Sequence, residues 1–378
     1  MLPRLRAAIL LASIAAAGAA TDLRPAFAMS PTGGDGAASK APVPAAEVAP
    51  LVHVPLEEED LLRKAAPPPA DVCLELVEAL RCSGFLRVTT PLVPPELQGR
   101  ALAAASALLD APPGGGGSGD GCRVGTVEVM EHPSDPKRYA MLSTPADVAA
   151  ASPVLAEYAH ALALARTALL RCVAAGLGLD PDYLARLHSE DNSSLRLLRY
   201  PRGTERTGNR CREHSDYGTL TLLLVDGISG LEAFHGGRWV PVPYSAGSLV
   251  VNAGSLLERW TGGTIPATLH RVAGPASSGG KGGSRSPRER EDLLAAVGRD
   301  RTSLAYFCDP DRGAAAELAG GDGDGDEGAS GTSVAEYIRW RSGGDDADAR
   351  RSGIAFTREE RARIDGNGGW GQGGGKSG

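Results

Sequence analysis

The most constraining feature of this sequence is the stretch Arg212 to Leu224, which reads REHSDYGTLTLLL. Its threonine and leucine content, and the Asp226-Gly227 turn signal that follows, predict a β-strand. Side chains two residues apart on a strand project from the same face, so we expect His214 and Asp216 to point together. A second imidazole follows at His270, within TLHRV. Two histidines and one carboxylate are typical of a non-heme Fe(II) site that leaves coordination positions open.

These three residues have two other interpretations. In the first, the three residues are unrelated polar residues, and in the second they bind zinc in a closed structural site. A structural zinc site needs four protein ligands and usually contains thiolates, and unrelated residues would not come with a strand-rich pattern around them. We therefore expect an open iron site with His214, Asp216 and His270 as the ligands.

A second pair of polar residues with the same spacing lies in RTSLAYF, where Arg301 and Ser303 are two residues apart on an expected strand. This pair suits an anionic co-substrate, because the guanidinium fork of arginine binds a carboxylate through two parallel hydrogen bonds. The alternative is an exposed strand pair without a ligand. Arg299 is the rival for this clamp, but it lacks a serine two residues further on.

The sequence resembles the iron(II)/2-oxoglutarate-dependent dioxygenases of the isopenicillin N synthase-like superfamily in the order and spacing of five segments, REHSDYGTLTLLL, GLEAF, GRWVPVPYSAGSLVVNAGSLLERWTGG, TLHRV and RTSLAYFCDPD. The resemblance runs from about Leu195 to Pro310, and a weaker part extends upstream to about Val54. It implies a mainly β fold with flanking helices, built on a double-stranded β-helix (jelly roll) with the metal at its mouth.

The resemblance also implies an activity. A dioxygenase of this family uses Fe(II), 2-oxoglutarate and O2, with ascorbate as an optional reductant, and hydroxylates, desaturates or cyclises a small-molecule substrate while releasing succinate and CO2. By resemblance, Arg301 and Ser303 hold the 5-carboxylate of 2-oxoglutarate. Tyr200, in a Tyr-Pro element that ends the expected strand Ser194 to Tyr200, contacts co-substrate or substrate, unless it is only an interior aromatic residue.

Two further functions stay open beside the dioxygenase. A 2-oxoglutarate-independent iron oxidase of the same fold would use the Arg-Ser pair to hold its substrate's own carboxylate, and succinate formation separates the two enzymes. A non-catalytic binding protein on a jelly-roll scaffold would neither bind Fe(II) nor consume O2.

The chain divides into several parts by composition and pattern. We expect a targeting segment at 1–28, a disordered linker at 29–50, a helical or mixed region at 51–190, a jelly-roll core at 191–312 with a flexible insertion at 277–299, and a partly disordered Gly/Asp-rich extension at 313–378. Within 51–190, apolar periodicity predicts helices around residues 73–80, 97–109 and 154–175. Asp71 is expected to cap the first of these helices and Gly84 to end it.

The N-terminal segment has the pattern of a targeting signal. Arg4 and Arg6 precede the apolar run Ala7 to Ala20, and an A-x-A motif follows at Ala26 to Ala28. The run is too short to span a bilayer, and no longer apolar segment follows. The expected destination is the secretory pathway or an organelle such as the plastid, and the cytoplasm if the signal is not cleaved or not functional.

Net charge and cysteine content argue against nucleic-acid binding, a thiolate zinc site and a disulfide scaffold. The net charge of −7 gives no dominant basic surface, so we expect a small-molecule substrate and no nucleic acid. The six cysteines include no C-x-x-C pair, which argues against a thiolate zinc site or a disulfide scaffold. Cys211 is expected to be a free thiol that faces away from His214. The arginines that precede the metal stretch are either solvated loop residues or a field that attracts anionic substrates: Arg196, Arg199, Arg202, Arg206, Arg210 and Arg212.

Overall fold

The structure is a computed structural model that describes residues 48–63, 67–111, 128–130, 137–203, 208–274, 277, 286–316 and 333–343. The expected targeting segment 1–28 and nearly all of the expected linker 29–50 lie outside the described residues. Within the described ranges, no helix combines the length and the apolar character needed to cross a membrane.

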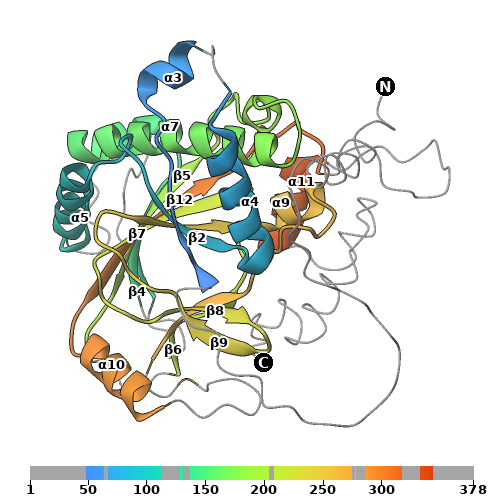
Figure 1. The fold of residues 1–378 in the computed structure, drawn as a ribbon. Helices are drawn as coiled ribbons and strands as arrows, with labels where there is room; N and C mark the ends of the chain where they lie inside the picture. Colours follow the sequence, from blue (N-terminus) through green and yellow to red (C-terminus); the bar gives the residue numbers. More distant parts are fainter. Residues whose placement is uncertain are drawn as a thin grey trace, which may run out of the picture.

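The strands of the described residues form two sheets that face each other (Figure 1). The larger sheet contains, in spatial order, β1 (Leu51–His53), β2 (Phe85–Thr89), β10 (Leu249–Ala253), β7 (Leu220–Val225), β12 (Arg301–Cys308), β5 (Ser194–Tyr200), β4 (Lys137–Leu142) and β3 (Glu128–Met130). The smaller sheet contains β6 (Asn209–His214), β11 (His270–Ala273), β8 (Leu231–His235) and β9 (Arg238–Pro241). Two facing sheets with helices outside confirm the expected mainly β fold.

Strand alternation gives the larger sheet two faces of different chemistry. One face is aliphatic and joins the main core, with Leu195 and Leu197 on β5 and Leu304 on β12. The other face, which looks toward the smaller sheet, carries Arg196 on β5 and Ser303 on β12. Successive side chains of a strand point to opposite faces. The residues of β5 and β12 that line the cavity between the sheets therefore lie at alternate positions of each strand.

Helices cover the outer, aliphatic face of the larger sheet. The described helices are α3 (Glu58–Arg63), α4 (Ala70–Ser83), α5 (Pro95–Leu109), α6 (Pro145–Ala151), α7 (Pro153–Gly176), α8 (Tyr183–Arg186), α9 (Ser255–Trp260), α10 (Pro287–Val297) and α11 (Val334–Gly343). α7 runs across this face with α4 and α5 beside it (Figure 1). Its buried side includes Leu155, Tyr158 and Leu162, as the 3.6-residue periodicity predicts.

The ends of α4 differ in part from the sequence-based expectation. Gly84 ends the helix as predicted, with φ of 73° and its N–H donated to the carbonyl of Leu80. Asp71 does not cap the helix, because the helix begins at Ala70 after Pro69 and no side chain caps it. Asp71 instead lies in the first turn, where a carboxylate still interacts favourably with the helix dipole.

The stretch Arg212 to Leu224 is not one strand. β6 ends at His214 and β7 begins at Leu220, so residues 215–219 form the connection between strands of different sheets. The prediction that His214 and Asp216 share a strand face is therefore wrong. His214 and Asp216 nevertheless lie close together, because hydrogen bonds from the start of α9 hold the 215–219 connection in place.

The expectation of a flexible insertion at 277–299 is wrong for residues 286–299. α10 begins with a capping box in which Ser286 and Glu289 exchange hydrogen bonds between side chain and backbone. Leu293, Ala296 and Val297 are buried, so a short apolar stripe holds the helix to the protein. Residues 278–285 lie outside the described part.

The described part of the expected C-terminal extension includes α11. Its Val334 N–H donates to the carbonyl of Ala314 at 2.8 Å, and Tyr337 is fully buried. The guanidinium of Arg259, on α9, lies 5.1 Å from the Tyr337 ring. This helix therefore packs against the same body as the rest of the described chain.

Candidate metal centre

Two histidines lie opposite each other at the edge where β6 ends and β11 begins. His270 pairs with His214 in the antiparallel register, and their ring centroids are 4.3 Å apart. The Nδ1 atom of His214 lies 2.8 Å from the carbonyl of Arg212, and that of His270 lies 3.2 Å from the carbonyl of Thr268. A carbonyl only accepts, so both rings donate from Nδ1–H, which leaves each Nε2 lone pair free for a metal.

Asp216 is fixed by the start of α9 although it lies in a connection between strands. The Ser255 N–H and hydroxyl both donate to the Asp216 carbonyl, at 2.9 and 3.0 Å. The Gly254 N–H donates to the carbonyl of Thr219, and the Leu256 N–H donates to the carbonyls of Tyr217 and Gly218. The first backbone N–H groups of a helix have no partner within the helix, so α9 uses them to dock this connection.

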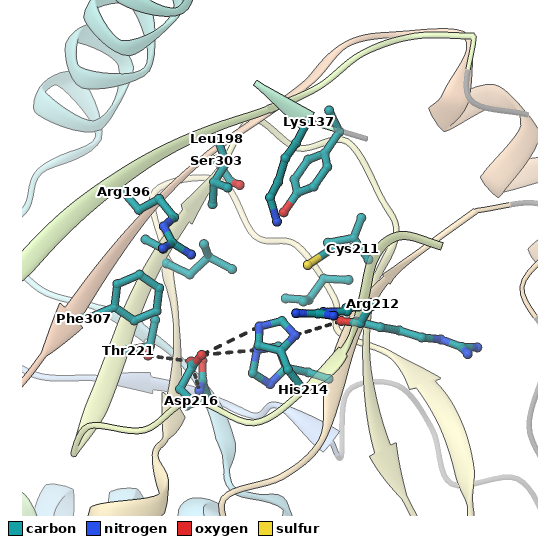
Figure 2. Close-up of a pocket in the computed structure, with 18 of the residues that line it drawn as sticks. Lys137, Arg196, Leu198, Cys211, Arg212, His214, Asp216, Thr221, Ser303 and Phe307 are labelled. Atoms are coloured by element: carbon teal, nitrogen blue, oxygen red, sulfur yellow. Dashed lines mark hydrogen bonds and ion pairs between the residues drawn. The ribbon is translucent and has the colours of Figure 1, made fainter. Parts of the chain in front are cut away.

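The carboxylate of Asp216 is oriented by two donors from the larger sheet. The Thr221 hydroxyl and the Asn252 amide donate to its Oδ2 atom, at 2.6 and 2.8 Å. The Oδ1 atom lies 3.8 Å from the Nε2 atom of His214 and 3.8 Å from that of His270. One oxygen is therefore anchored and the other faces both imidazoles (Figure 2).

These three side chains fit a divalent metal ion. All ligand atoms of His214, Asp216 and His270 lie within 4.8 Å of one another. An ion about 2.1 Å from each ligand atom can bridge the 3.8 Å separations between Nε2 and Oδ1. The group found in the described residues has these three members, so it has the composition of an open two-histidine, one-carboxylate site for Fe(II).

The protonation states of the ligands also suit a metal. Burial lowers the pKa of His214 to about 4, and repulsion from a protonated His270 acts in the same direction. Burial would raise the pKa of Asp216, but the two imidazoles and the hydrogen bonds from Asn252 and Thr221 outweigh it, so the net pKa is lowered. At neutral pH His214 is thus neutral and Asp216 is ionised, which are the forms that bind metals.

A β-bulge brings Cys211 into the site, against expectation. His270 pairs with His214 and Val272 pairs with Cys211, so two residues of β6, Arg212 and Glu213, oppose one of β11, Arg271. The extra residue shifts the alternation, and both Cys211 and His214 line the cavity. Cys211 is in no disulfide with a described residue, as predicted, but it does not face away from His214.

The predicted clamp lies on the inner face of the larger sheet. Arg301 has 1% of its surface exposed, and it donates from Nε to the carbonyl of Ile228 and from a terminal nitrogen to the Ser303 hydroxyl. Its guanidinium carbon lies 5.5 Å from the Tyr200 ring centroid. Within the described residues Arg301 has no carboxylate partner, so it holds a buried positive charge that an anionic ligand would balance. Arg299 is exposed and does not line the cavity.

The candidate metal ligands and the predicted clamp share one cavity of about 200 Å³ between the two sheets. His214, Asp216 and His270 line it together with Tyr200, Arg301 and Ser303. Every residue that the sequence singled out as a site residue is therefore in this cavity. Figure 2 shows its polar floor around Asp216 and its wall with Arg196, Leu198 and Phe307.

Several residues of the site were missed by the sequence analysis. Thr221, Asn252 and Ser255 orient Asp216, and Lys137 lines the cavity. Arg196, one of the arginines for which the sequence left two interpretations open, also lines it. A weak signal existed for Asn252, which is the only amide within the apolar strand LVVNA. A buried amide in such a strand needs a hydrogen-bond partner, and here the partner is a metal ligand.

Part of the chain matches a known protein family. Residues 191–310 match the sequence model of the 2OG-Fe(II) oxygenase superfamily. The matched segment begins just before β5 and ends just after β12, so it contains His214, Asp216, His270, Arg301 and Ser303.

Individual relatives point the same way. The chain is 39% identical over 153 residues to the 2-oxoglutarate-dependent dioxygenase gloF of Glarea lozoyensis, covering 39% of this chain and 43% of that protein. It is 36% identical over 152 residues to the 2-oxoglutarate-Fe(II) type oxidoreductase ppzD of Metarhizium rileyi, covering 38% of each chain. The match thus spans less than half the length of these curated relatives.

A solved structure extends the similarity of fold beyond the matched segment. A full-length Neurospora crassa protein, crystallised in complex with alpha-KG and 5-formyluracil, superposes with a TM-score of 0.60 at 20% identity. The superposition covers 78% of this chain and 95% of that chain. The shared architecture therefore includes the helices that flank the two sheets.

Proposed function

We propose that this chain, which belongs to the 2OG-Fe(II) oxygenase superfamily through residues 191–310, is an Fe(II)- and 2-oxoglutarate-dependent dioxygenase that oxidises a C–H bond of a small molecule. One observation carries the proposal. A three-ligand metal site and a buried, carboxylate-free Arg301 beside Ser303 open into the same cavity.

His214, Asp216 and His270 would hold the iron. Their Nδ1–H and Oδ2 contacts fix the rings and the carboxylate before the metal arrives, so little conformational freedom is lost on binding. Such iron supplies O2 activation coupled to the oxidative decarboxylation of 2-oxoglutarate. Electrons balance, because 2-oxoglutarate gives two and the substrate C–H bond gives two, and the two oxygen atoms go to succinate and to the hydroxylated product.

Arg301 and Ser303 would bind the 5-carboxylate of 2-oxoglutarate. The guanidinium of Arg301 is held by the Ile228 carbonyl and flanked by the Tyr200 ring, so its remaining donors are oriented in advance. In a buried site these charge-assisted hydrogen bonds are roughly twice as strong as neutral ones. Leu198, on the same face of β5 as Tyr200, adds apolar surface that excludes water beside the clamp.

The proposal is tested by measuring succinate formation, O2 uptake and metal binding on the same preparations. Purified protein with Fe(II), ascorbate and 2-oxoglutarate should form succinate, faster when a metabolite extract supplies the substrate. His214→Ala, Asp216→Ala and His270→Ala should each abolish succinate formation while cooperative unfolding is retained. O2 uptake without succinate would instead identify a 2-oxoglutarate-independent oxidase, and a chain that binds no Fe(II) would not be an oxygenase.

The clamp assignment has a matched control in Arg299. Arg301→Gln should raise the KM for 2-oxoglutarate roughly thirtyfold to a thousandfold, because a buried charge-assisted contact contributes about 2–4 kcal/mol. Iron affinity should change little. Arg299→Gln should leave the KM unchanged, since that side chain is exposed. A damaging Arg299→Gln with a mild Arg301→Gln would contradict the assignment.

A further inference from the structure

A second cation in the cavity has no role in the dioxygenase chemistry described above. Arg196 projects from β5 into the cavity, on the side of Phe307 and Asp216 (Figure 2). It makes no hydrogen bond or ion pair with any described residue, and its Nε atom is buried without a hydrogen-bond partner among them. This half-buried guanidinium has no acidic partner among the described residues, so it is available to an anion in the cavity.

Two aromatic rings hold Arg196 in place without neutralising it. Its guanidinium carbon lies 5.7 Å from the ring centroid of Tyr139 on β4 and 5.6 Å from that of Phe307 on β12. Cation–π contacts of this kind orient an arginine while its N–H groups stay available. The residue opposite Arg196 on β12 is Ala305, whose small side chain also lines the cavity.

The strand register separates Arg196 from the proposed 2-oxoglutarate clamp. Arg301 pairs with Tyr200, whereas Arg196 pairs with Ala305, four residues further along β12. Four residues of a strand span roughly 13 Å. The guanidinium of Arg301 also lies near the Tyr200 ring and that of Arg196 near the Phe307 ring, so the two arginines are placed to bind two different anionic groups.

The charges of the cavity also call for another anion. Asp216 is the only acidic residue among those described as lining it, and of the cations Arg271 is paired with Glu232 and Glu213, at 2.9 and 3.0 Å. Iron, Asp216, 2-oxoglutarate and Arg301 together carry no net charge. Arg196 then remains in excess, and two further cations line the same cavity, Lys137 from β4 and the exposed Arg212 from β6 (Figure 2).

The cavity also has an apolar part. Leu198, Leu223, Leu231 and Phe307 line it, and Phe307 is also in contact with Arg196. We propose that Arg196 binds the carboxylate of the prime substrate, and that this substrate is a small monocarboxylic acid with an apolar body. The inference rests on the proposed dioxygenase function, since it takes Arg301 to be occupied by 2-oxoglutarate.

Matched pairs of neutral and anionic probes test this inference by binding rather than by turnover. The full chain, loaded with redox-inert Zn(II) and saturating 2-oxoglutarate, is titrated with phenylacetate and phenylacetamide, and with hexanoate and hexanamide. Each carboxylate should bind at least tenfold more tightly than its amide, because the paired guanidinium adds charge-assisted hydrogen bonds. Equal affinities within both pairs, or no binding of either acid, would overturn the proposal.

Variants on one strand assign the effect to Arg196. Arg196→Gln should remove the preference for the carboxylate, and Arg196→Lys should restore part of it through the retained charge. Arg199→Gln is the control, because Arg199 lies three residues along β5 and pairs with Asp110 outside the cavity. A carboxylate preference that survives Arg196→Gln, or that is lost equally in Arg199→Gln, would overturn the assignment.

The same titrations separate this inference from the proposed function. Binding of 2-oxoglutarate is measured first, and it should be retained in Arg196→Gln and lost in Arg301→Gln. Intact 2-oxoglutarate binding without a carboxylate preference would overturn the role of Arg196 alone. Failure of the wild-type chain to bind 2-oxoglutarate would overturn the dioxygenase proposal and, with it, this assignment of two arginines to two anions.

Discussion

Single atoms of one side chain have separate tasks at the metal centre. Oδ2 of Asp216 accepts hydrogen bonds from Thr221 and Asn252, whereas Oδ1 faces the Nε2 atoms of His214 and His270. A carboxylate with one anchored oxygen cannot rotate freely, so its other oxygen is already placed for a metal. Partners of this kind typically change metal affinity or activity by about 10- to 100-fold.

Replacing Asn252 should therefore weaken the metal site without removing a ligand. We expect Asn252→Ala to lower Fe(II) affinity by about tenfold or more, because Asp216 loses one of its two side-chain donors. The affinity is measured by competition with a fluorescent chelator under anaerobic conditions. Asn192→Ala is the control, since Asn192 hydrogen-bonds to Glu190 and Pro310. Equal affinities in wild type and Asn252→Ala would show that Thr221 alone suffices.

The sequence singled out the three candidate ligands that the structure brings together, but not the residues that orient Asp216. His214, Asp216 and His270 are chemically distinctive, and they lie within recognisable segments. Thr221 and Asn252 are ordinary strand residues in sequence, and they act together only because Asn252 pairs with Thr221 across β10 and β7. That register depends on the assembled sheet, which no local pattern contains.

At the scale of elements, connections decide the geometry more than strand alternation does. Two devices bring the ligands together: the bulge in β6 that places both Cys211 and His214 in the cavity, and the 215–219 connection that docks on α9. Neither has a strong local signature, so the sequence predicted one continuous strand in their place. The helix α10 was missed for another reason, because its capping box at Ser286 follows a Gly/Ser/Lys-rich run that is typical of flexible loops.

The docking of the 215–219 connection on α9 predicts opposite outcomes for two glycines. A Cβ at Gly254 would overlap the carbonyl of Gly218, whereas a Cβ at Gly99 on α5 would meet nothing. Gly254→Ala should lower the free energy of unfolding by about 1–3 kcal/mol through this overlap and weaken metal binding, since the connection carries Asp216. Gly99→Ala should raise it by roughly 0.5–1 kcal/mol, because alanine restricts the unfolded chain.

Urea denaturation and metal titration measure both effects. A neutral Gly254→Ala would mean that the connection shifts without cost, and its metal affinity would then show whether Asp216 moves with it. Gly99 is far along the chain from the candidate metal ligands and faces solvent. Reduced metal affinity in Gly99→Ala would therefore contradict the explanation that Gly254→Ala weakens metal binding by displacing the 215–219 connection.

At the scale of the whole molecule, the cavity joins the two sheets. His214 and His270 belong to the smaller sheet, whereas Thr221 and Arg301 belong to the larger one. Apolar contacts among Leu198, Tyr200, Cys211, Val272 and Ala305 also cross between the sheets. A metal and 2-oxoglutarate bound in this cavity would add further links across the same gap.

Ligand binding should therefore stabilise the entire fold rather than one loop. A ligand at a hundred times its Kd adds about 2.7 kcal/mol to the free energy of unfolding, and for a domain of this size each kcal/mol raises Tm by roughly 2–4 °C. We expect Zn(II) to raise Tm by several degrees, and 2-oxoglutarate to raise it further only when the metal is present. The two increments are measured by differential scanning calorimetry on the full chain.

Variants assign each increment to its residues. His270→Ala should abolish both increments, because 2-oxoglutarate binding depends on the metal. Arg301→Gln should keep the metal increment and lose most of the 2-oxoglutarate increment, whereas Arg299→Gln should keep both. An increment from 2-oxoglutarate in the absence of metal would mean that Arg301 and Ser303 alone bind the co-substrate tightly. No increment from Zn(II) in the wild-type chain would contradict a metal site that links the two sheets.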